Sequence, residues 1–362
     1  MLPLTRAAAD AGHDVVFVTG ADAVRYAASP GVEVCAVDSG ERSDGLARYL
    51  GQFPRAELEK LTPDQRFAHM FAHYMVGIGA ADRLEDMLTF VRGRRPDLIV
   101  TSAAERAAML AAIILGVPFA VHGISSPKSA TVMEAAWNVT GEIARQHGVE
   151  ALPDRTAIPY VDIWPQRLAP RDVSAEFPLR VPMQTVPRTG GARSPVLDGL
   201  PFERTAYITA GTSHNQRPGF LEAMIDAFRD TRINAVATVG RDVDPARFGA
   251  TPAHIRIEQF VPQEQLLPHV DLVVCHAGAG TILGALTHAV PLVVSPLATD
   301  QFEMAAQVAA AEAGLVATAD RESIAAAVRA VCENPAYRVC AQVLSSEITE
   351  LSTPAEVLDR LL

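Results

Sequence analysis

The sequence has few cysteines and no excess of positive charge. Four cysteines occur in 362 residues, and no two of them form a C-x-x-C pair. This argues against a disulfide framework or a structural zinc site, and it indicates a reducing cytoplasm. Lys and Arg number 31 against 42 Asp and Glu, giving a net charge of −11. An acidic balance of this size argues against a nucleic-acid-binding protein.

Long hydrophobic runs are also lacking. The longest apolar stretch, Ala107 to Val121, is interrupted by Gly116 and Pro118. It is shorter than the ~20 apolar residues that cross a membrane. No cationic segment followed by an apolar stretch opens the sequence, so neither a membrane span nor a secretory signal is expected.

Apolar strands alternate with helical patterns through most of the chain, which predicts an α/β protein with parallel sheets. Polar residues 38–62 predict a loop, residues 62–91 predict helices, and the proline-rich residues 152–201 predict the passage between two domains. The predicted strands are Asp14–Thr19, Val32–Val37, Asp97–Ser102, Phe119–His122, Thr205–Thr209, Ala235–Val239, Ile255–Gln259, Leu272–Cys275 and Leu292–Ser295.

The most informative stretch runs from Asp271 to Gln301 and reads DLVVCHAGAGTILGALTHAVPLVVSPLATDQ. It predicts a strand, a glycine-rich turn, a helix and a second strand. Glycines let a backbone approach an anion, and the first N–H groups of a helix have no partner inside it. His276 ends the first strand, at the edge where parallel sheets bind ligands.

A dinucleotide fingerprint is the first interpretation of this turn. It requires G-x-G-x-x-G, and Gly278 and Gly280 supply two of the glycines. The third position is Leu283, with Gly284 one residue late, and Asp300 follows well after the next strand. The pattern therefore disfavours a nicotinamide-dependent enzyme.

The order HAGAGT, ALTHAVP, PLATDQ resembles instead the donor-sugar motif of family 1 glycosyltransferases, and the bacterial antibiotic and macrolide-type branch most of all. AGHDV at residues 11–15, RPDLIV at 95–100 and QFVPQ at 259–263 extend the resemblance. It implies the GT-B fold, in which two Rossmann-like domains face each other across a cleft. The expected parts are an acceptor-binding domain (1–182), a linker (183–203), a nucleotide-sugar-binding domain (204–348) and a C-terminal helix that packs back on the first domain (349–362).

The resemblance also implies which residues bind the donor. Backbone N–H groups and small hydroxyls would hold the diphosphate, an aromatic residue would flank the nucleobase, and a carboxylate with an amide would hold sugar hydroxyls. The candidates are Gly211, Thr212, Ser213, Phe260, Val261, Gln263, His276, Gly278, Ala279, Gly280, Thr281, Asp300 and Gln301. Core packing is the alternative for Phe260, and a helix N-cap is the alternative for Asp300.

The catalytic base is a separate question. In the resembled family, a histidine follows a first strand that would lie between Asp14–Thr19 and Asp97–Ser102. This sequence opens at Met1, inside the helix that comes after that histidine, so the base is not among these residues. Either an upstream segment exists or the short form is genuine. His13 is not a substitute, and Glu105 is the candidate orienting acid, with a solvated helix start as the alternative.

The implied reaction is inverting, metal-independent sugar transfer, with a TDP-deoxysugar favoured over a UDP-sugar. The expected partners are the nucleotide sugar and a small-molecule natural-product acceptor. Neither a cofactor nor a metal is expected, and a homodimer is considered. His69, His73 and His122 are weak acceptor-site candidates, while Asp242-Val243-Asp244 is interpreted as a loop and not as a metal motif. A catalytically impaired helper protein and a nucleotide-sugar epimerase remain alternatives.

Overall fold

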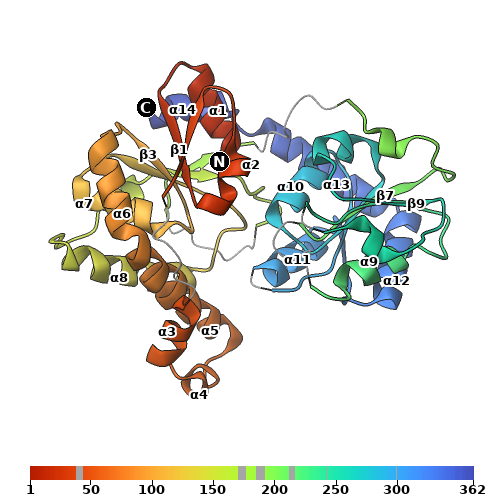
Figure 1. The fold of residues 1–362 in the computed structure, drawn as a ribbon, viewed down its shortest axis with the longest axis horizontal. Helices are drawn as coiled ribbons and strands as arrows, with labels where there is room; N and C mark the ends of the chain where they lie inside the picture. Colours follow the sequence, from red (N-terminus) through yellow and green to blue (C-terminus); the bar gives the residue numbers. More distant parts are fainter. Residues whose placement is uncertain (38–43, 170–176, 185–191, 212–216, 242, 299) are drawn as a thin grey trace. The chain divides into compact units, whose positions relative to one another are not determined.

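The computed structural model describes residues 1–37, 44–169, 177–184, 192–211, 217–241, 243–298 and 300–362, which form two compact units (Figure 1). The first contains Met1–Ile163, Arg171–Met183 and Ser352–Leu362, and the second contains Trp164–Pro170 and Gln184–Leu351. Trp164–Pro170 thus group with the second unit, although the sequence analysis places them in the first domain. One reason is the buried Trp164 indole, whose N–H donates to Gln307 Oε1 at 2.9 Å.

The first unit contains two parallel sheets. Their orders are β1-β2 and β3-β4-β5-β6, so β1 and β3 lie in different sheets. Both nevertheless join one apolar cluster through Val18 and Ile99. Helix α1 contacts β1, and its Leu4 packs in a second cluster with Val100 of β3. The strands are β1 (Val15–Thr19), β2 (Val32–Ala36), β3 (Ile99–Ser102), β4 (Phe119–His122), β5 (Tyr160–Asp162) and β6 (Arg180–Pro182).

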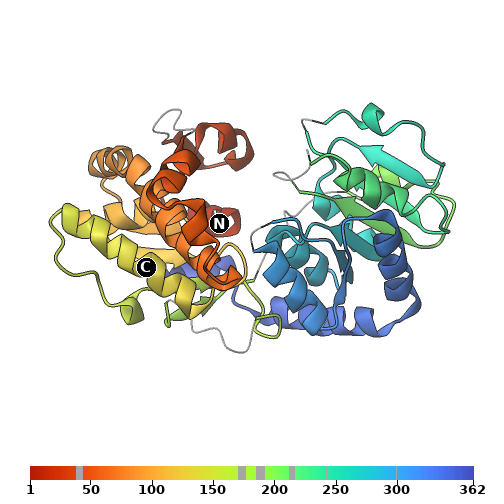
Figure 2. The ribbon, with the colours of Figure 1, turned by 90° about the horizontal axis from the view of Figure 1, so that it is seen from below.

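Helices cover these sheets. Residues 63–94 form one continuous helical segment, begun by a capping box between Thr62 and Gln65, and α8 lies along it (Figure 2). The helices are α1 (Leu2–Asp10), η1 (Ala21–Ala23), α2 (Val24–Ala27), α3 (Gly45–Gln52), α4 (Arg55–Leu58), α5 (Pro63–Met70), the π-helix η2 (Phe71–Ile78), α6 (Gly79–Arg94), α7 (Arg106–Leu115), α8 (Ala130–Gln146) and η3 (Arg155–Ala157).

The predicted loop at residues 38–62 is wrong over much of its length, because α3 and α4 form there. Tyr49 and Leu58 are buried from these helices, and Ile78 of η2 completes their apolar cluster. Burial of these side chains stabilises both helices, and Arg48 of α3 also pairs with Asp82 of α6.

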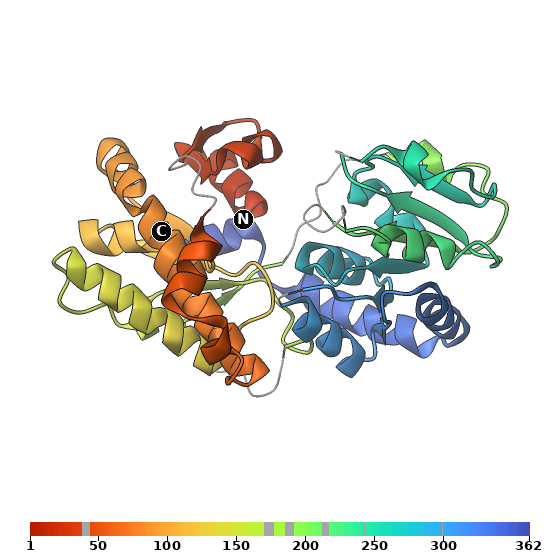
Figure 3. The same ribbon diagram turned by 60° about the horizontal axis from the view of Figure 1, so that its bottom comes forward.

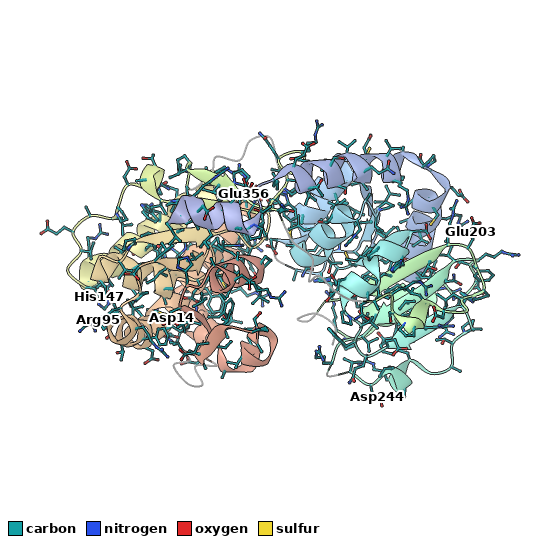
Figure 4. All side chains as sticks on the ribbon, turned by 90° about the horizontal axis from the view of Figure 1, so that it is seen from above. Asp14, Arg95, His147, Glu203, Asp244 and Glu356 are labelled. Atoms are coloured by element: carbon teal, nitrogen blue, oxygen red, sulfur yellow. The ribbon has the colours of Figure 1, made fainter. Side chains whose placement is uncertain are left out.

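The last helix, α14 (Pro354–Leu361), belongs to the first unit and packs against α1 (Figure 3). A capping box between Thr353 and Glu356, labelled in Figure 4, starts this helix. Val357 and Leu358 are buried with Leu4 in one apolar cluster. The chain end is therefore an integral part of the first unit's core.

The second unit is built on one six-stranded parallel sheet of order β12-β11-β10-β7-β8-β9, which confirms the expected α/β class. The inner strands β7, β8 and β10 are buried along their whole length, as expected for a sheet covered on both faces. The strands are β7 (Thr205–Thr209), β8 (Asn234–Thr238), β9 (Ile255–Glu258), β10 (Leu272–Cys275), β11 (Leu292–Val294) and β12 (Gly314–Val316).

Helices α9 and α12 pack on one face of this sheet, around Phe220, Phe228 and Ile324, and α10 and α13 lie on the other (Figure 1). The helices are η4 (Pro195–Leu197), α9 (Phe220–Asp226), η5 (Pro245–Phe248), η6 (Gln263–Gln265), η7 (Leu267–His269), α10 (Ala279–Thr287), α11 (Gln301–Ala310), α12 (Arg321–Glu333) and α13 (Ala336–Glu350). Across the described residues of both units, no helix is long and apolar enough to cross a membrane.

Candidate functional site

The carboxyl ends of four neighbouring strands carry most of the predicted donor-binding residues. Because β10, β7, β8 and β9 are parallel and adjacent, the turns that follow them lie along one edge of the sheet. Gly211 follows β7, Phe260 follows β9 and His276 follows β10. Parallel sheets bind their ligands at this edge, so the structure brings these residues to the expected place.

The turn after β10 is sharp. Ala277 has a φ of 66°, a left-handed conformation that non-glycine residues rarely adopt. Gly278 then occupies the N-cap of α10. His276 is only 7% exposed between strand and helix. Burial raises the pKa of the preceding Cys275 to about 12, so this thiol stays protonated and is no nucleophile.

Two glycines enclose the His276 ring. A Cβ on Gly278 would lie 2.6 Å from Nε2 of His276, and a Cβ on Gly211 would lie 2.6 Å from its Cε1. Side-chain atoms do not approach this closely, so any larger residue at either position must displace the ring. Gly211 also has a φ of 69°, which disfavours other residues there. The turns after β7 and β10 therefore pack on each other through this imidazole.

Helix α10 presents its N-terminus at the same edge. The N–H groups of Thr281 and Ile282 both donate to Gly278 O at 3.0 Å. The N–H groups of Ala279 and Gly280 precede them, in the first turn, where no intrahelical acceptor exists. A Cβ on Gly280 would find nothing within 4 Å. The turn thus offers backbone donors, a helix dipole and open space, which together suit an anion.

Gln263 contacts the side chain of Thr281 in the first turn of α10. Its Nε2 lies 3.4 Å from Thr281 Oγ1 and 3.4 Å from the hydroxyl of Tyr207, which in turn lies 2.9 Å from Thr238 Oγ1. Burial raises the pKa of Tyr207, so its hydroxyl stays neutral in this network. The contacts make Gln263 a residue that positions Thr281. Val261, two residues before it, is buried.

Phe260 is 46% exposed, so core packing does not explain it. The guanidinium carbon of Arg241, which follows β8, lies 3.6 Å from the centroid of the Phe260 ring. Gln259 Nε2 donates to Arg241 O at 2.5 Å and ties the two turns together. Arg241 was not among the predicted site residues, because a single arginine after a strand forms no recognisable motif.

Asp300 and Gln301 begin α11, which follows β11. Asp300 holds the N-cap position, as the alternative predicted, although its side chain makes no capping hydrogen bond. Gln301 is 4% exposed, and its Oε1 accepts from the N–H groups of Leu297 and Ala298 at 2.8 and 3.1 Å. The amide therefore shapes the loop that carries Asp300.

Three residues singled out in the sequence, Thr212, Ser213 and Asp242, lie outside the described residues. Asp244, labelled in Figure 4, caps η5 by accepting from Ala246 N–H at 2.9 Å. This contact agrees with the interpretation of Asp244 as a loop residue.

His122 is the most buried of the acceptor-site candidates in the first unit. It ends β4 opposite Ser102 of β3 and is 0% exposed. Its Nδ1 lies 2.6 Å from Gly123 O, and since a carbonyl only accepts, Nδ1 carries the proton. Nε2 has no hydrogen-bond partner among the described residues. Burial lowers the pKa of His122 to about 3, so the imidazole stays neutral.

His69 and His73 lie together in an aromatic cluster. Their ring centroids are 4.4 Å apart, and Phe53 packs 4.5 Å from His69 and 4.8 Å from His73. The Tyr49 hydroxyl lies 2.9 Å from His69 Nδ1. Burial is the main cause that lowers the pKa of both histidines. The cluster is a neutral, partly apolar surface of α3, α5 and η2.

Glu105 lies at the start of a helix, as the alternative to an orienting acid predicted. Its side chain is the N-cap of α7, where it accepts from Ala107 N–H at 2.9 Å. It also lies 3.2 Å from Arg83 Nη2. Both contacts use the carboxylate to hold α7 in place.

Comparison with known proteins agrees with this geometry. Residues 224–362 match the family described as Erythromycin biosynthesis protein CIII-like, C-terminal domain. The chain is 28% identical to elloramycin glycosyltransferase ElmGT of Streptomyces olivaceus, over 99% of this chain and 92% of that relative. The glycosyltransferase SnogD from Streptomyces nogalater has a similar structure, with a TM-score of 0.75, 26% identity and coverage of 99% and 93%. Spinosyn rhamnosyltransferase SpnG complexed with thymidine diphosphate gives a TM-score of 0.80, 23% identity and coverage of 100% and 95%.

Proposed function

Because this chain is a glycosyltransferase of the antibiotic-biosynthesis type, with the GT-B fold and an EryCIII-like C-terminal domain, we propose that it transfers a deoxysugar from a thymidine-diphosphate sugar to a hydroxyl of a small natural product. One observation carries the proposal. The His276 ring, enclosed by Gly211 and Gly278, lies beside the open N-terminus of α10. An anion such as a diphosphate fits that arrangement.

The residues of the second unit have distinct roles in this proposal. The N–H groups of Ala279 and Gly280 and the hydroxyl of Thr281 receive the diphosphate, with His276 beside them. Charge grows on the diphosphate as its bond to the sugar breaks, and donors that are already oriented stabilise that charge most in the transition state. Asp300 accepts hydrogen bonds from sugar hydroxyls, and Phe260 flanks the nucleobase.

The reaction we propose inverts the anomeric centre. The acceptor oxygen forms a bond to the anomeric carbon as the bond from that carbon to the diphosphate oxygen breaks. The hydroxyl proton passes to a general base, and the thymidine diphosphate leaves with the electron pair. No metal ion takes part in this scheme, so a chelator should leave the rate unchanged.

The first unit is proposed to bind the acceptor. The rings of Phe53, His69 and His73 offer flat, partly exposed surfaces. Such surfaces suit the apolar rings of a polyketide-like molecule. His122 Nε2 could accept a hydrogen bond from a hydroxyl that reaches the end of β4.

Binding and turnover measurements on the full chain test the proposal in two stages. Calorimetric titration with TDP should show binding that His276→Ala weakens at least tenfold, or ~1.4 kcal/mol. The matched control is His269→Ala, since His269 is an exposed histidine of the same unit. A TDP-deoxysugar and a panel of aglycones should then yield a product heavier by one sugar. Sugar conversion without any acceptor would indicate an epimerase instead.

A further inference from the structure

The stacked pair Arg241 and Phe260 lies at the ligand edge of the second sheet. A distance of 3.6 Å from guanidinium carbon to ring centroid corresponds to direct face-on contact. Both residues are exposed, and they follow the adjacent strands β8 and β9. The pair therefore forms a flat, two-layered surface at the sheet edge that also holds the His276 turn.

Structural stabilisation does not account for Arg241. Among the described residues, its guanidinium makes no ion pair and no hydrogen bond, and it stacks on the Phe260 ring. A second stacked arginine in the same unit shows the contrast. Arg247 lies 5.1 Å from the Phe248 ring centroid, and it is held by Glu222 at 2.7 Å. Arg241 has instead a charged planar group on an open ring, with its donors available.

We propose that Arg241 is the second wall of the nucleobase site, so that the base of the donor inserts between its guanidinium and the Phe260 ring. This inference rests on the proposed function. Pyrimidine rings stack well on both groups, since guanidinium planes and aromatic faces are the usual platforms for bases. The backbone of Arg241 stays fixed by Gln259 while its long side chain moves outward by the thickness of one ring.

The geometry explains why an arginine suits this position. Its planar group can pack flat on a base, whereas a lysine ammonium is a compact, strongly hydrated charge. The guanidinium lies over one face of the Phe260 ring.

Titration of the full chain with TDP and with inorganic pyrophosphate tests this inference. Arg241→Ala should weaken TDP binding about fivefold to tenfold, and Phe260→Ala about tenfold to a hundredfold, as stacking of one base predicts. Pyrophosphate has no base, so its affinity should be the same in wild type and both variants. Arg241→Lys should bind TDP more weakly than wild type. Arg247→Ala is the matched control and should match wild type in both titrations.

Coupling between the two residues provides a second test. If one base contacts both walls, the double variant should lose less TDP affinity than the two single losses combined. The inference is overturned if Arg241→Ala binds TDP like wild type, or if it loses TDP and pyrophosphate affinity equally, which would make Arg241 a phosphate ligand. A wild-type chain that does not bind TDP would instead overturn the proposed function itself. Circular dichroism of each variant would confirm that it is folded.

Discussion

Gly278 and His276 lie in contact across one tight turn, so close that a methyl group on Gly278 would sit 2.6 Å from Nε2 of the imidazole. Gly278 has an ordinary backbone conformation, with a φ of −71°. Its lack of a side chain is therefore required for space and not for backbone freedom. The glycine-rich turn is therefore shaped around the imidazole ring.

We expect Gly278→Ala to push the His276 ring from its place and to weaken TDP binding. Forcing a methyl group into a filled space costs roughly 1–3 kcal/mol, so the affinity should fall about tenfold, with a lower midpoint of thermal unfolding. Calorimetry and thermal denaturation measure both effects.

Gly280→Ala is the control for this prediction, because a Cβ at position 280 meets nothing within 4 Å and alanine favours a helix. Its thermal midpoint should equal or exceed that of wild type. Equal stability losses in both variants would show that crowding of His276 is not the cause.

Gln301 is expected to position Asp300 more than to touch the sugar. Gln301→Ala leaves the N–H groups of Leu297 and Ala298 without their acceptor, at a cost of roughly 1–3 kcal/mol in the free energy of unfolding. Gln301→Glu keeps an acceptor in the same place, so its stability should stay near that of wild type. Urea denaturation measures the difference.

Turnover of the Gln301→Glu variant separates the two roles. If Gln301 only positions Asp300, the Gln301→Glu variant should largely retain kcat/KM for the donor sugar, because its loop is intact. A stable Gln301→Glu protein with a strongly raised KM for the TDP-sugar would show that the amide binds the sugar directly.

Much of the second unit could be predicted because its signals are local. Its long apolar strands lie within a residue of the predicted ends, and Thr205–Thr209 and Leu272–Cys275 match fully. Three short strands, β5, β6 and β12, were not predicted. Each has three residues and pairs with a strand that is distant in sequence. Strand β11 has the same length, but it could be predicted because it lies in the apolar run VPLVV at residues 290–294.

The first unit shows where local patterns fail. The helix α3 is short and leaves Leu46 and Leu50 exposed, and it is stabilised by contacts distant in sequence: the packing of Tyr49 and the ion pair of Arg48 with Asp82. Strands β1 and β3 fall in two separate sheets, although the alternating pattern gave no sign of a break between them. The Arg241–Phe260 stack joins turns after two different strands, so the sequence could not reveal it.

Replacing Glu105 should lower the free energy of unfolding more than it lowers kcat. Removing its capping carboxylate in Glu105→Ala should lower the free energy of unfolding by ~1 kcal/mol, the usual value of a helix N-cap. Glu105→Ser keeps a capping oxygen but loses the negative charge near Arg83. We expect Glu105→Ser to be nearly as stable as wild type and to keep its kcat. A stable Glu105→Ser protein with a kcat reduced a hundredfold would support the orienting role instead.

Acid should destabilise the first unit through His122. Its pKa in the folded protein is about 3, because burial disfavours the charged ring, whereas an unfolded histidine has a pKa of ~6.5. As the pH falls below ~6.5 the unfolded chain takes up a proton that the folded protein does not. The contribution of this histidine to stability is therefore complete above ~6.5 and declines as the pH falls toward the folded pKa, by up to ~1.4 kcal/mol per pH unit.

The variant for this test is His122→Asn, whose amide can replace the Nδ1 donor to Gly123 O. Urea denaturation at several pH values between 4 and 8 gives the free energy of unfolding of both proteins. Other groups with lowered pKa values, such as His69, His73 and His288, are common to both and cancel in the difference. Wild type should lose more stability than the variant as the pH falls. If the two plots of the free energy of unfolding against pH run parallel, the His122 ring takes up a proton while the protein is folded. The ring would then reach water without unfolding of the protein.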